Sequence, residues 1–214
     1  MKKVTIGFIL ALTALATGCT TTDSTRNLAD ASVPGKVLAQ QVCSICHGAD
    51  GNSTNPTFPK LAGQQEAYLV AQLTDFRSHG RSDPAGSEYM WGISRHLTDV
   101  QIQQLAAYFS QQQPKADQPT HPQLEADGKA IFIKGLANQN ENVPACESCH
   151  GAKGEGNAAF PRIAGQHADY IAKQLNVFRN TEQRPKGTMM KVITHDLSPG
   201  EIQAVAAYVS TMPQ

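Results

Sequence analysis

The sequence has few aromatic residues and no run of basic ones. Phe, Trp and Tyr make up 6% of its 214 residues and hydrophobic residues 40%, which is little apolar volume for two conventional cores. Lys and Arg number 18 and are matched by 18 Asp and Glu, so the formal net charge is zero. Without a basic patch, the chain shows no electrostatic sign of a nucleic-acid partner. Its length allows one or two domains, and two would need apolar material beyond the side chains.

Strand-like alternation is absent too, since no run alternates apolar and polar residues over six positions. Apolar residues instead recur at i, i+4 and i+7, as on one face of a helix. This spacing occurs in Leu69, Leu73 and Phe76, and again in Ile171, Leu175 and Phe178. Capping-box patterns, which mark helix starts, begin at Thr98 and Ser198. The sequence therefore predicts an all-α fold.

The apolar run at residues 6–16 is too short to span a bilayer, which takes about 20 residues. It follows two lysines and leads to Cys19 in a pattern that resembles a bacterial lipobox, although Ala16 stands where Leu is commoner. We therefore predict a lipoprotein-type signal peptide over residues 1–19, with Cys19 lipidated, in preference to an ordinary secretory signal cut nearby. The polar residues 20–33 are expected to form a flexible tether.

The other four cysteines belong to two copies of one hexapeptide, residues 43–48 and 146–151, each reading C-x-x-C-H-G. C-x-x-C-H is the attachment signature of c-type haem. Two thiols nearly one helical turn apart can bond the two vinyl groups of a porphyrin, and the next residue, His47 or His150, can ligate the iron. A zinc site would bring two C-x-x-C pairs to one metal, and a thioredoxin-like pair needs no adjacent histidine. The predicted attachment residues are Cys43, Cys46, Cys146 and Cys149. Two covalent haem c groups would also supply the missing apolar volume.

The duplication extends beyond the hexapeptides. A second motif, Phe-Pro-x-(Leu/Ile)-Ala-Gly-Gln, occurs at residues 58–64 and 160–166, and Ala-Ala-Tyr ends at Tyr108 and Tyr208. Two copies are too few for a solenoid, so we expect a duplicated domain. The expected parts are a first domain at 34–112, a Pro/Gln-rich linker at 113–123 and a second domain at 124–214.

Met90 and Met190 stand at matching positions, in the expected loops before the last helix of each copy. We expect their thioethers to be the second iron ligands, which would give each iron a Met/His pair. Met189 stays open as an alternative to Met190, whereas Met212 lies too near the C-terminus. Four other histidines compete, and we expect them to be surface or helix-cap residues: His79, His96, His167 and His195. A Met/His iron has no open position and a raised potential, which predicts an electron carrier and not an enzyme.

These motifs, recurring twice in the same order, resemble the dihaem cytochrome c4 family over residues 34–212. The resemblance implies two tandem cytochrome c-like domains related by a pseudo-twofold axis, with the haem propionates facing each other. It also implies periplasmic electron transfer from a quinol-cytochrome c reductase-type donor to a terminal oxidase such as the cbb3 type. Two features depart from the family pattern: Trp91 follows Met90, and the second copy has extra residues at 136–145, expected as a surface loop.

Residues that support the haem are assigned by position. A proximal histidine needs a partner for its second ring nitrogen. The carbonyls of Pro59 and Pro161 can supply one, unless these prolines serve only the turn. Arg77 and Arg179 end matching helices and can pair with propionates, or they remain solvated.

Two kinds of protein fit this pattern. The first is a freestanding periplasmic shuttle, held to a membrane by its N-terminal lipid. The second is the haem subunit of an oxidoreductase complex, such as a flavocytochrome-type sulfide dehydrogenase. The sequence shows no conspicuous exposed apolar stretch, which favours the shuttle.

Overall fold

The computed structural model describes residues 25–84, 86–137 and 142–213. The predicted signal peptide, with Cys19, and the start of the predicted tether lie outside this part. Among the described helices, none is long and apolar enough to cross a membrane.

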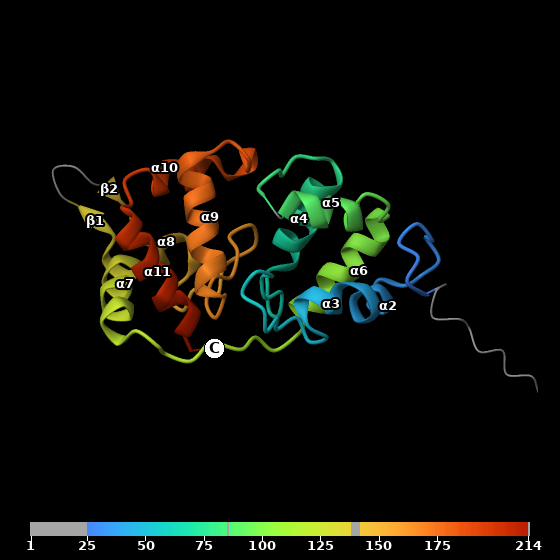
Figure 1. Cartoon of the computed structure of the whole chain (residues 1–214), viewed down its shortest axis with the longest axis horizontal. Coiled ribbons are helices and arrows are strands. Elements are labelled where there is room, and N and C mark those ends of the chain that lie inside the picture. Colours follow the sequence, from blue (N-terminus) through green and yellow to red (C-terminus); the bar gives the residue numbers. More distant parts are fainter. Residues whose placement is uncertain (1–24, 85, 138–141, 214) are drawn as a thin grey trace, which may run out of the picture.

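The chain forms two helical lobes that lie side by side, joined by a linker along one edge (Figure 1). The first lobe contains α2 (Gly35–Leu38), the π-helical turn η1 (Ala39–Cys43), α3 (Ser44–His47), α4 (Glu66–Arg77), α5 (Gly86–Ser94) and α6 (Asp99–Ser110). The second contains α7 (Pro122–Lys134), α8 (Glu147–His150), α9 (Ala168–Asn180), the 3-10 turn η2 (Pro185–Gly187), α10 (Thr188–Thr194) and α11 (Pro199–Thr211). The same order of helices in each lobe confirms the predicted all-α, duplicated architecture.

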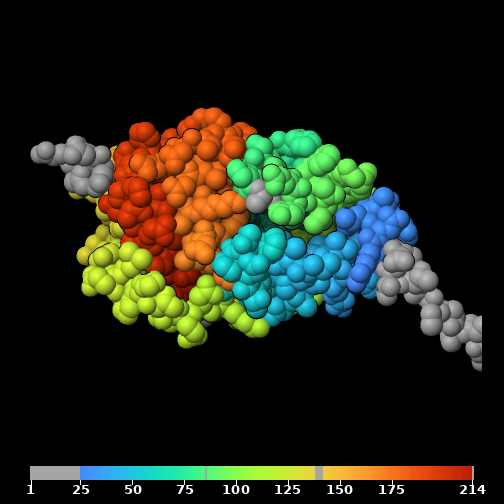
Figure 2. Space-filling model, viewed as in Figure 1, coloured from blue at the N-terminus to red at the C-terminus, as the bar shows by residue number. Residues whose placement is uncertain are grey.

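Each lobe closes a core of its own. In the first, the fully buried Leu38, Ile102 and Leu105 pack α2 against α6. In the second, Phe132 and Val209 pack α7 against α11. The space-filling view shows the two lobes in contact along their facing sides (Figure 2). Each core is therefore built from residues of its own lobe, and the two lobes meet at an interface.

The first and last helices of each lobe cross at close range. A Cβ on Gly128 of α7 would lie 1.9 Å from the carbonyl oxygen of Ala204, so only glycine permits this approach. Gly35 holds the matching place in the first lobe, where a Cβ would lie 2.5 Å from that of Gln104. The repeated glycines thus set the spacing of the helices that frame each core.

Both predicted capping boxes are present. Thr98 Oγ1 accepts from the backbone N–H of Gln101 at 3.2 Å, and Ser198 Oγ accepts from the backbone N–H of Glu201 at 3.3 Å. The side chains of Gln101 and Glu201 accept in return from the amides of the two capping residues. These reciprocal bonds satisfy orphan amides and fix where α6 and α11 begin.

The predicted tether is not free where the structure describes it. Gln101 Nε2 on α6 donates to the carbonyls of Asp30 and Val33, each at 3.0 Å, and Leu28 packs against the first core. The polar composition of this segment predicted a solvated chain. Val33, at the end of the segment, is itself buried in the first core, so the segment is attached by both polar and apolar contacts.

The second lobe differs from expectation at two places. The insertion at residues 136–145 contains an antiparallel pair of short strands, β1 (Leu136–Ala137) and β2 (Asn142–Val143), and Val143 is buried. Helix α7 starts inside the predicted linker, at Pro122, because proline suits the first helical position.

Candidate haem-binding site

Both C-x-x-C-H motifs line one cavity of about 570 Å³ that receives side chains from both lobes. Most of its walls are apolar, and the predicted helix stripes of α4 and α9 supply much of them. The motif residues at the cavity are Cys43, Cys46, His47, Cys146, Cys149 and His150. The helices therefore enclose an apolar space with thiols and imidazoles along it, which suits a large, flat, apolar group.

The two motif histidines are buried and bonded alike. Nδ1 of His47 donates to the carbonyl of Pro59 at 2.8 Å, and Nδ1 of His150 to that of Pro161 at 2.9 Å. A carbonyl can only accept, so Nδ1 carries the proton and Nε2 keeps its lone pair. Burial lowers the pKa of both imidazoles although the carbonyl bond opposes it, so the rings are neutral at pH 7. Each histidine is held in the tautomer that an iron ligand requires.

The first thiol of each motif is held in its protonated form by burial. Burial raises the pKa of Cys43 to about 12 and that of Cys146 to about 11, so both stay protonated at neutral pH. Reactive redox pairs and zinc sites need thiolates. Within the described ranges, no cluster of three or more His, Cys, Asp or Glu could hold a metal ion. These observations disfavour the zinc and thioredoxin-like alternatives.

Met90 and Met190 both line the cavity. The sequence predicted them in loops, but they lie within the short helices α5 and α10. Their carbonyls accept matching bonds, from Ser94 Oγ at 2.6 Å and Thr194 Oγ1 at 2.7 Å. Met189 also reaches the cavity but is 57% exposed, whereas Met190 packs against the second core. The surroundings therefore favour Met190 over Met189.

The remaining candidate ligands lie away from the cavity. His96 and His195 are exposed after α5 and α10, and His79 is exposed with its ring stacked on Trp91 at a centroid distance of 4.7 Å. Met212 follows α11 and is buried in the second core. These positions agree with the expected surface and structural roles.

His167 differs from that expectation because it is buried between the lobes. Its Nε2 lies 2.9 Å from the carbonyl of Ser53, and its Nδ1 lies 3.2 Å from Asp117 of the linker. Asp117 Oδ1 also accepts from Lys60 Nζ at 2.6 Å. His167 therefore joins the first lobe, the linker and the second lobe.

Two arginines that the sequence analysis did not single out reach the cavity wall. Arg81 is 5% exposed, and its Nε lies 2.5 Å from Asp83 Oδ1. Arg184 donates to Tyr68 Oη of the other lobe at 3.0 Å. Both guanidiniums share Gln174 Oε1, at 3.3 Å and 2.7 Å. Two cations beside one buried carboxylate leave a positive charge that a haem carboxylate would match.

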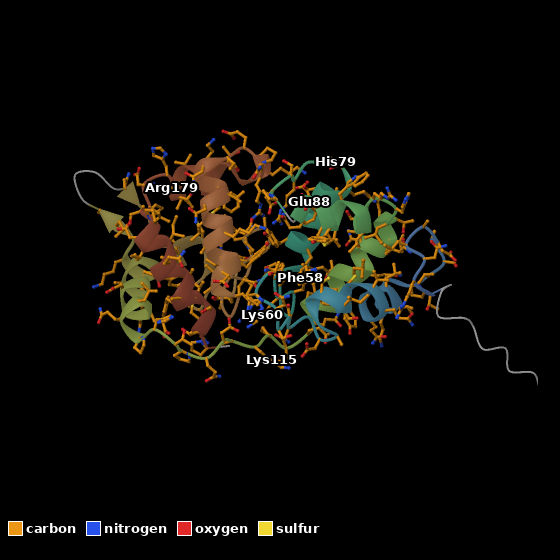
Figure 3. The ribbon with its side chains drawn as sticks, viewed as in Figure 1. Phe58, Lys60, His79, Glu88, Lys115 and Arg179 are labelled. Atoms are coloured by element: carbon orange, nitrogen blue, oxygen red, sulfur yellow. The ribbon has the colours of Figure 1, made fainter. Side chains whose placement is uncertain are left out.

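Arg77 and Arg179, predicted to meet propionates, do not line the cavity. Arg77 donates to the carbonyl of Leu97 at 2.8 Å and to Asp99 at 2.6 Å, which places it at the start of α6. Arg179 lies at the upper end of α9 (Figure 3). Arg81 and Arg184 stand in the loops after the same two helices. In both copies the sequence has a second arginine a few residues after the first, which could have indicated an alternative partner for the propionates. Only the paths of the loops show that this second arginine faces the cavity.

The second repeated motif joins the lobes through its glutamines. The amide of Lys60 donates to Gln166 Oε1 at 2.8 Å, and Gln166 Nε2 returns a bond to the carbonyl of Lys60 at 2.9 Å. In the other direction, the amide of Arg162 donates to Gln64 Oε1 at 2.7 Å, and Gln64 Nε2 donates to the carbonyl of Arg162 at 2.9 Å. Figure 3 shows Lys60 near the boundary between the lobes. The pairing has the reciprocity of a pseudo-twofold interface.

Comparison with known proteins agrees with this geometry. A family model described as cytochrome c matches residues 32–113 and 125–213. Cytochrome c4 from Stutzerimonas stutzeri is 38% identical over 218 residues, which cover 98% of each chain. This chain belongs to the dihaem cytochrome c4 family. A crystal structure of reduced recombinant cytochrome c4 from Pseudomonas stutzeri matches with a TM-score of 0.74 and 37% identity, over 86% of this chain and 99% of that one. A protein named thiosulfate dehydrogenase electron acceptor, from Stutzerimonas stutzeri (strain A1501), is 36% identical over 82% of this chain and 81% of its own length.

As a member of the cytochrome c4 family, the chain carries two covalent haem c groups and acts as an electron carrier. The residues present fit these groups: apolar walls, the four motif thiols, two neutral histidines and two inward arginines surround one cavity. Bound haem supplies a one-electron iron couple. The protein supplies the attachment residues Cys43, Cys46, Cys146 and Cys149, the ligands His47 and His150, and a largely apolar enclosure.

Proposed function

We propose that this cytochrome c4-type protein carries single electrons in the periplasm, from a quinol-cytochrome c reductase-type donor to a terminal oxidase such as the cbb3 type. Met90 and Met190 are the second axial ligands. The observation that supports this best is that both methionines share the cavity with the two neutral, carbonyl-bonded histidines. Six filled positions leave an iron able to accept and release electrons but not to bind a substrate.

We further propose that Cys19 holds the protein to a membrane through lipid. The support is in the sequence: a short apolar run, small residues and Gly-Cys at the end of an N-terminal signal. Haem attachment of this type also requires export. Radiolabelled palmitate should enter the native protein and not a Cys19→Ser variant, which should fractionate as periplasmic and unanchored. Equal labelling of both forms would contradict the anchor.

A second candidate function is electron acceptance within a sulfur-oxidising enzyme complex, of the flavocytochrome sulfide dehydrogenase or thiosulfate dehydrogenase kind. The name of one relative points that way. Exposed apolar side chains outside the cavity also favour a docked partner: Ile45 in the first lobe and Val192 in the second are each more than half exposed. A shuttle should purify alone from native membranes, whereas a subunit should copurify with its dehydrogenase in fixed ratio.

The proposed function is tested by a redox titration of the native holoprotein with optical spectra. We expect two one-electron steps, the weak far-red band of sulfur–iron ligation in the oxidised form, and no reaction of the reduced form with carbon monoxide. Carbon monoxide or cyanide binding readily to either iron would show an open position. That result would reject the carrier assignment of the site.

A further inference from the structure

Each proximal histidine is bonded to a peptide group that the opposite lobe holds at its other end. The carbonyl of Pro59 accepts from His47 Nδ1 at 2.8 Å. The N–H of the same peptide group belongs to Lys60 and donates to Gln166 Oε1 at 2.8 Å. Lys60 and Gln166 are 9% and 7% exposed, so this link is shielded from water.

The same link runs in the other direction. The carbonyl of Pro161 accepts from His150 Nδ1 at 2.9 Å, and the amide of Arg162 in that peptide group donates to Gln64 Oε1 at 2.7 Å. Gln64 is 7% exposed. A glutamine of each lobe thus lies one peptide group away from the proximal histidine of the other.

Hydrogen bonds in such a chain strengthen one another. When the N–H of an amide donates, its carbonyl gains negative charge and becomes a better acceptor, an effect of about 10–30% per bond. A better acceptor on Nδ1–H makes the imidazole a stronger donor to the iron. A more basic ligand stabilises the oxidised iron and lowers its reduction potential.

We propose that Gln166 and Gln64 are positioning residues that tune the haem of the opposite lobe, Gln166 through Pro59–Lys60 and His47, and Gln64 through Pro161–Arg162 and His150. The proposal rests on the haem ligation stated above. Because linkage is reciprocal, a redox change that strengthens a histidine–carbonyl bond also tightens the interface. Each potential is therefore linked to the one hydrogen bond that its glutamine makes across the interface.

The test measures both potentials in the holoprotein with Gln166→Met, Gln64→Met and Gln65→Met. Gln65 is the matched control, because its Nε2 also bonds across the interface, to the carbonyl of Glu155 at 2.9 Å, but the N–H of that peptide group, on Gly156, donates to the backbone carbonyl of His150 and not to its imidazole. Each haem is followed by NMR through the methyl signal of its own axial methionine. We expect Gln166→Met to raise only the first potential, Gln64→Met only the second, and Gln65→Met neither.

Equal shifts in both haems, or a shift confined to the haem of the mutated lobe, would overturn the proposal. Gln166→Glu keeps an oxygen that can accept from the Lys60 N–H, so it should hold the first potential at or below the native value. Comparing it with Gln166→Met separates the effect of losing this hydrogen bond from the effect of altered side-chain packing. In Gln166→Met the Nδ1–H signal of His47 should also move upfield. If the glutamine variants keep the native potentials and the far-red band, the proposed effect of the glutamines is rejected but the Met/His ligation is not. If the native protein itself lacks that band, the Met/His ligation is rejected.

Discussion

Two neighbouring methionines, Met189 and Met190, show how surroundings decide a ligand. They are chemically identical and adjacent, so spacing in the sequence barely separates them. In the fold Met189 is 57% exposed, whereas Met190 packs against the second core. The match between Met190 and Met90 was visible in the sequence, but the burial that supports it was not.

Replacing Met190 with Ala should remove the thioether from the second iron. We expect the far-red band to lose about half its intensity and the reduced protein to bind carbon monoxide at one of its two haems, because an axial position opens. Met189→Ala is the control and should change neither. The prediction fails if Met189→Ala opens the site and Met190→Ala does not.

Replacing Arg184 with Met should lower at least one reduction potential, because it removes a positive charge from the cavity wall and positive charge favours the reduced iron. Arg179→Met removes the same charge from a position outside the cavity and should leave both potentials close to native. Spectroelectrochemistry of the two variants at matched ionic strength decides between them. If Arg184→Met and Arg179→Met lowered the reduction potentials equally, the cause would be the overall charge of the protein and not the charge at the cavity wall.

Among the elements, those with their own local signals were predictable and those without were not. Helices α4, α6, α9 and α11 carry apolar stripes or capping boxes, and all four are present. Helices α5 and α10 hold nine and seven residues, too few for an apolar pattern to repeat, and isolated helices shorter than about 12 residues are marginal in water. Packing beside the cavity is what makes the methionine segments helical.

The capping box of α11 should carry measurable stability. Ser198→Ala removes the acceptor for the Glu201 amide and should cost about 1 kcal/mol of unfolding free energy. Denaturant unfolding of the holoprotein measures this, with Ser82→Ala at an exposed loop position as control. A cost no larger than that of the control would mean that packing alone fixes the start of the helix.

At the scale of the whole molecule, the lobes are joined by buried polar groups that titrate. Burial opposes ionisation of Asp83, yet the guanidinium of Arg81 holds the pKa of this carboxyl below its ordinary value of 3.8. Asp83 also accepts from Gln174 of the second lobe at 3.1 Å. The ionised carboxylate therefore contributes to the contact between the lobes.

A carboxyl group whose pKa is lower in the folded than in the unfolded state stabilises the fold. This stabilisation is fully present above the pKa of the unfolded state, about 4, and is lost as the pH falls through the pKa of the folded state. The unfolding free energy of the native protein should therefore drop more steeply below about pH 4 than that of Asp83→Asn, which has no such charge to lose. Denaturant titrations at a series of pH values measure the slopes. Asp127→Asn, at an exposed carboxylate, should follow the native slope, and equal slopes for all three would contradict the prediction.

The sequence by itself determined the chemistry that is local in the chain: two attachment motifs, two copies of one helical domain, and the capped starts of α6 and α11. Each of these depends on residues a few positions apart, so the spacing alone carries the information. Only the tertiary structure decided which arginines face the cavity, why Met190 is favoured over Met189, and that Lys60 meets Gln166 from 106 residues away. Such contacts depend on how two closed cores dock, and no periodicity within either copy records that arrangement.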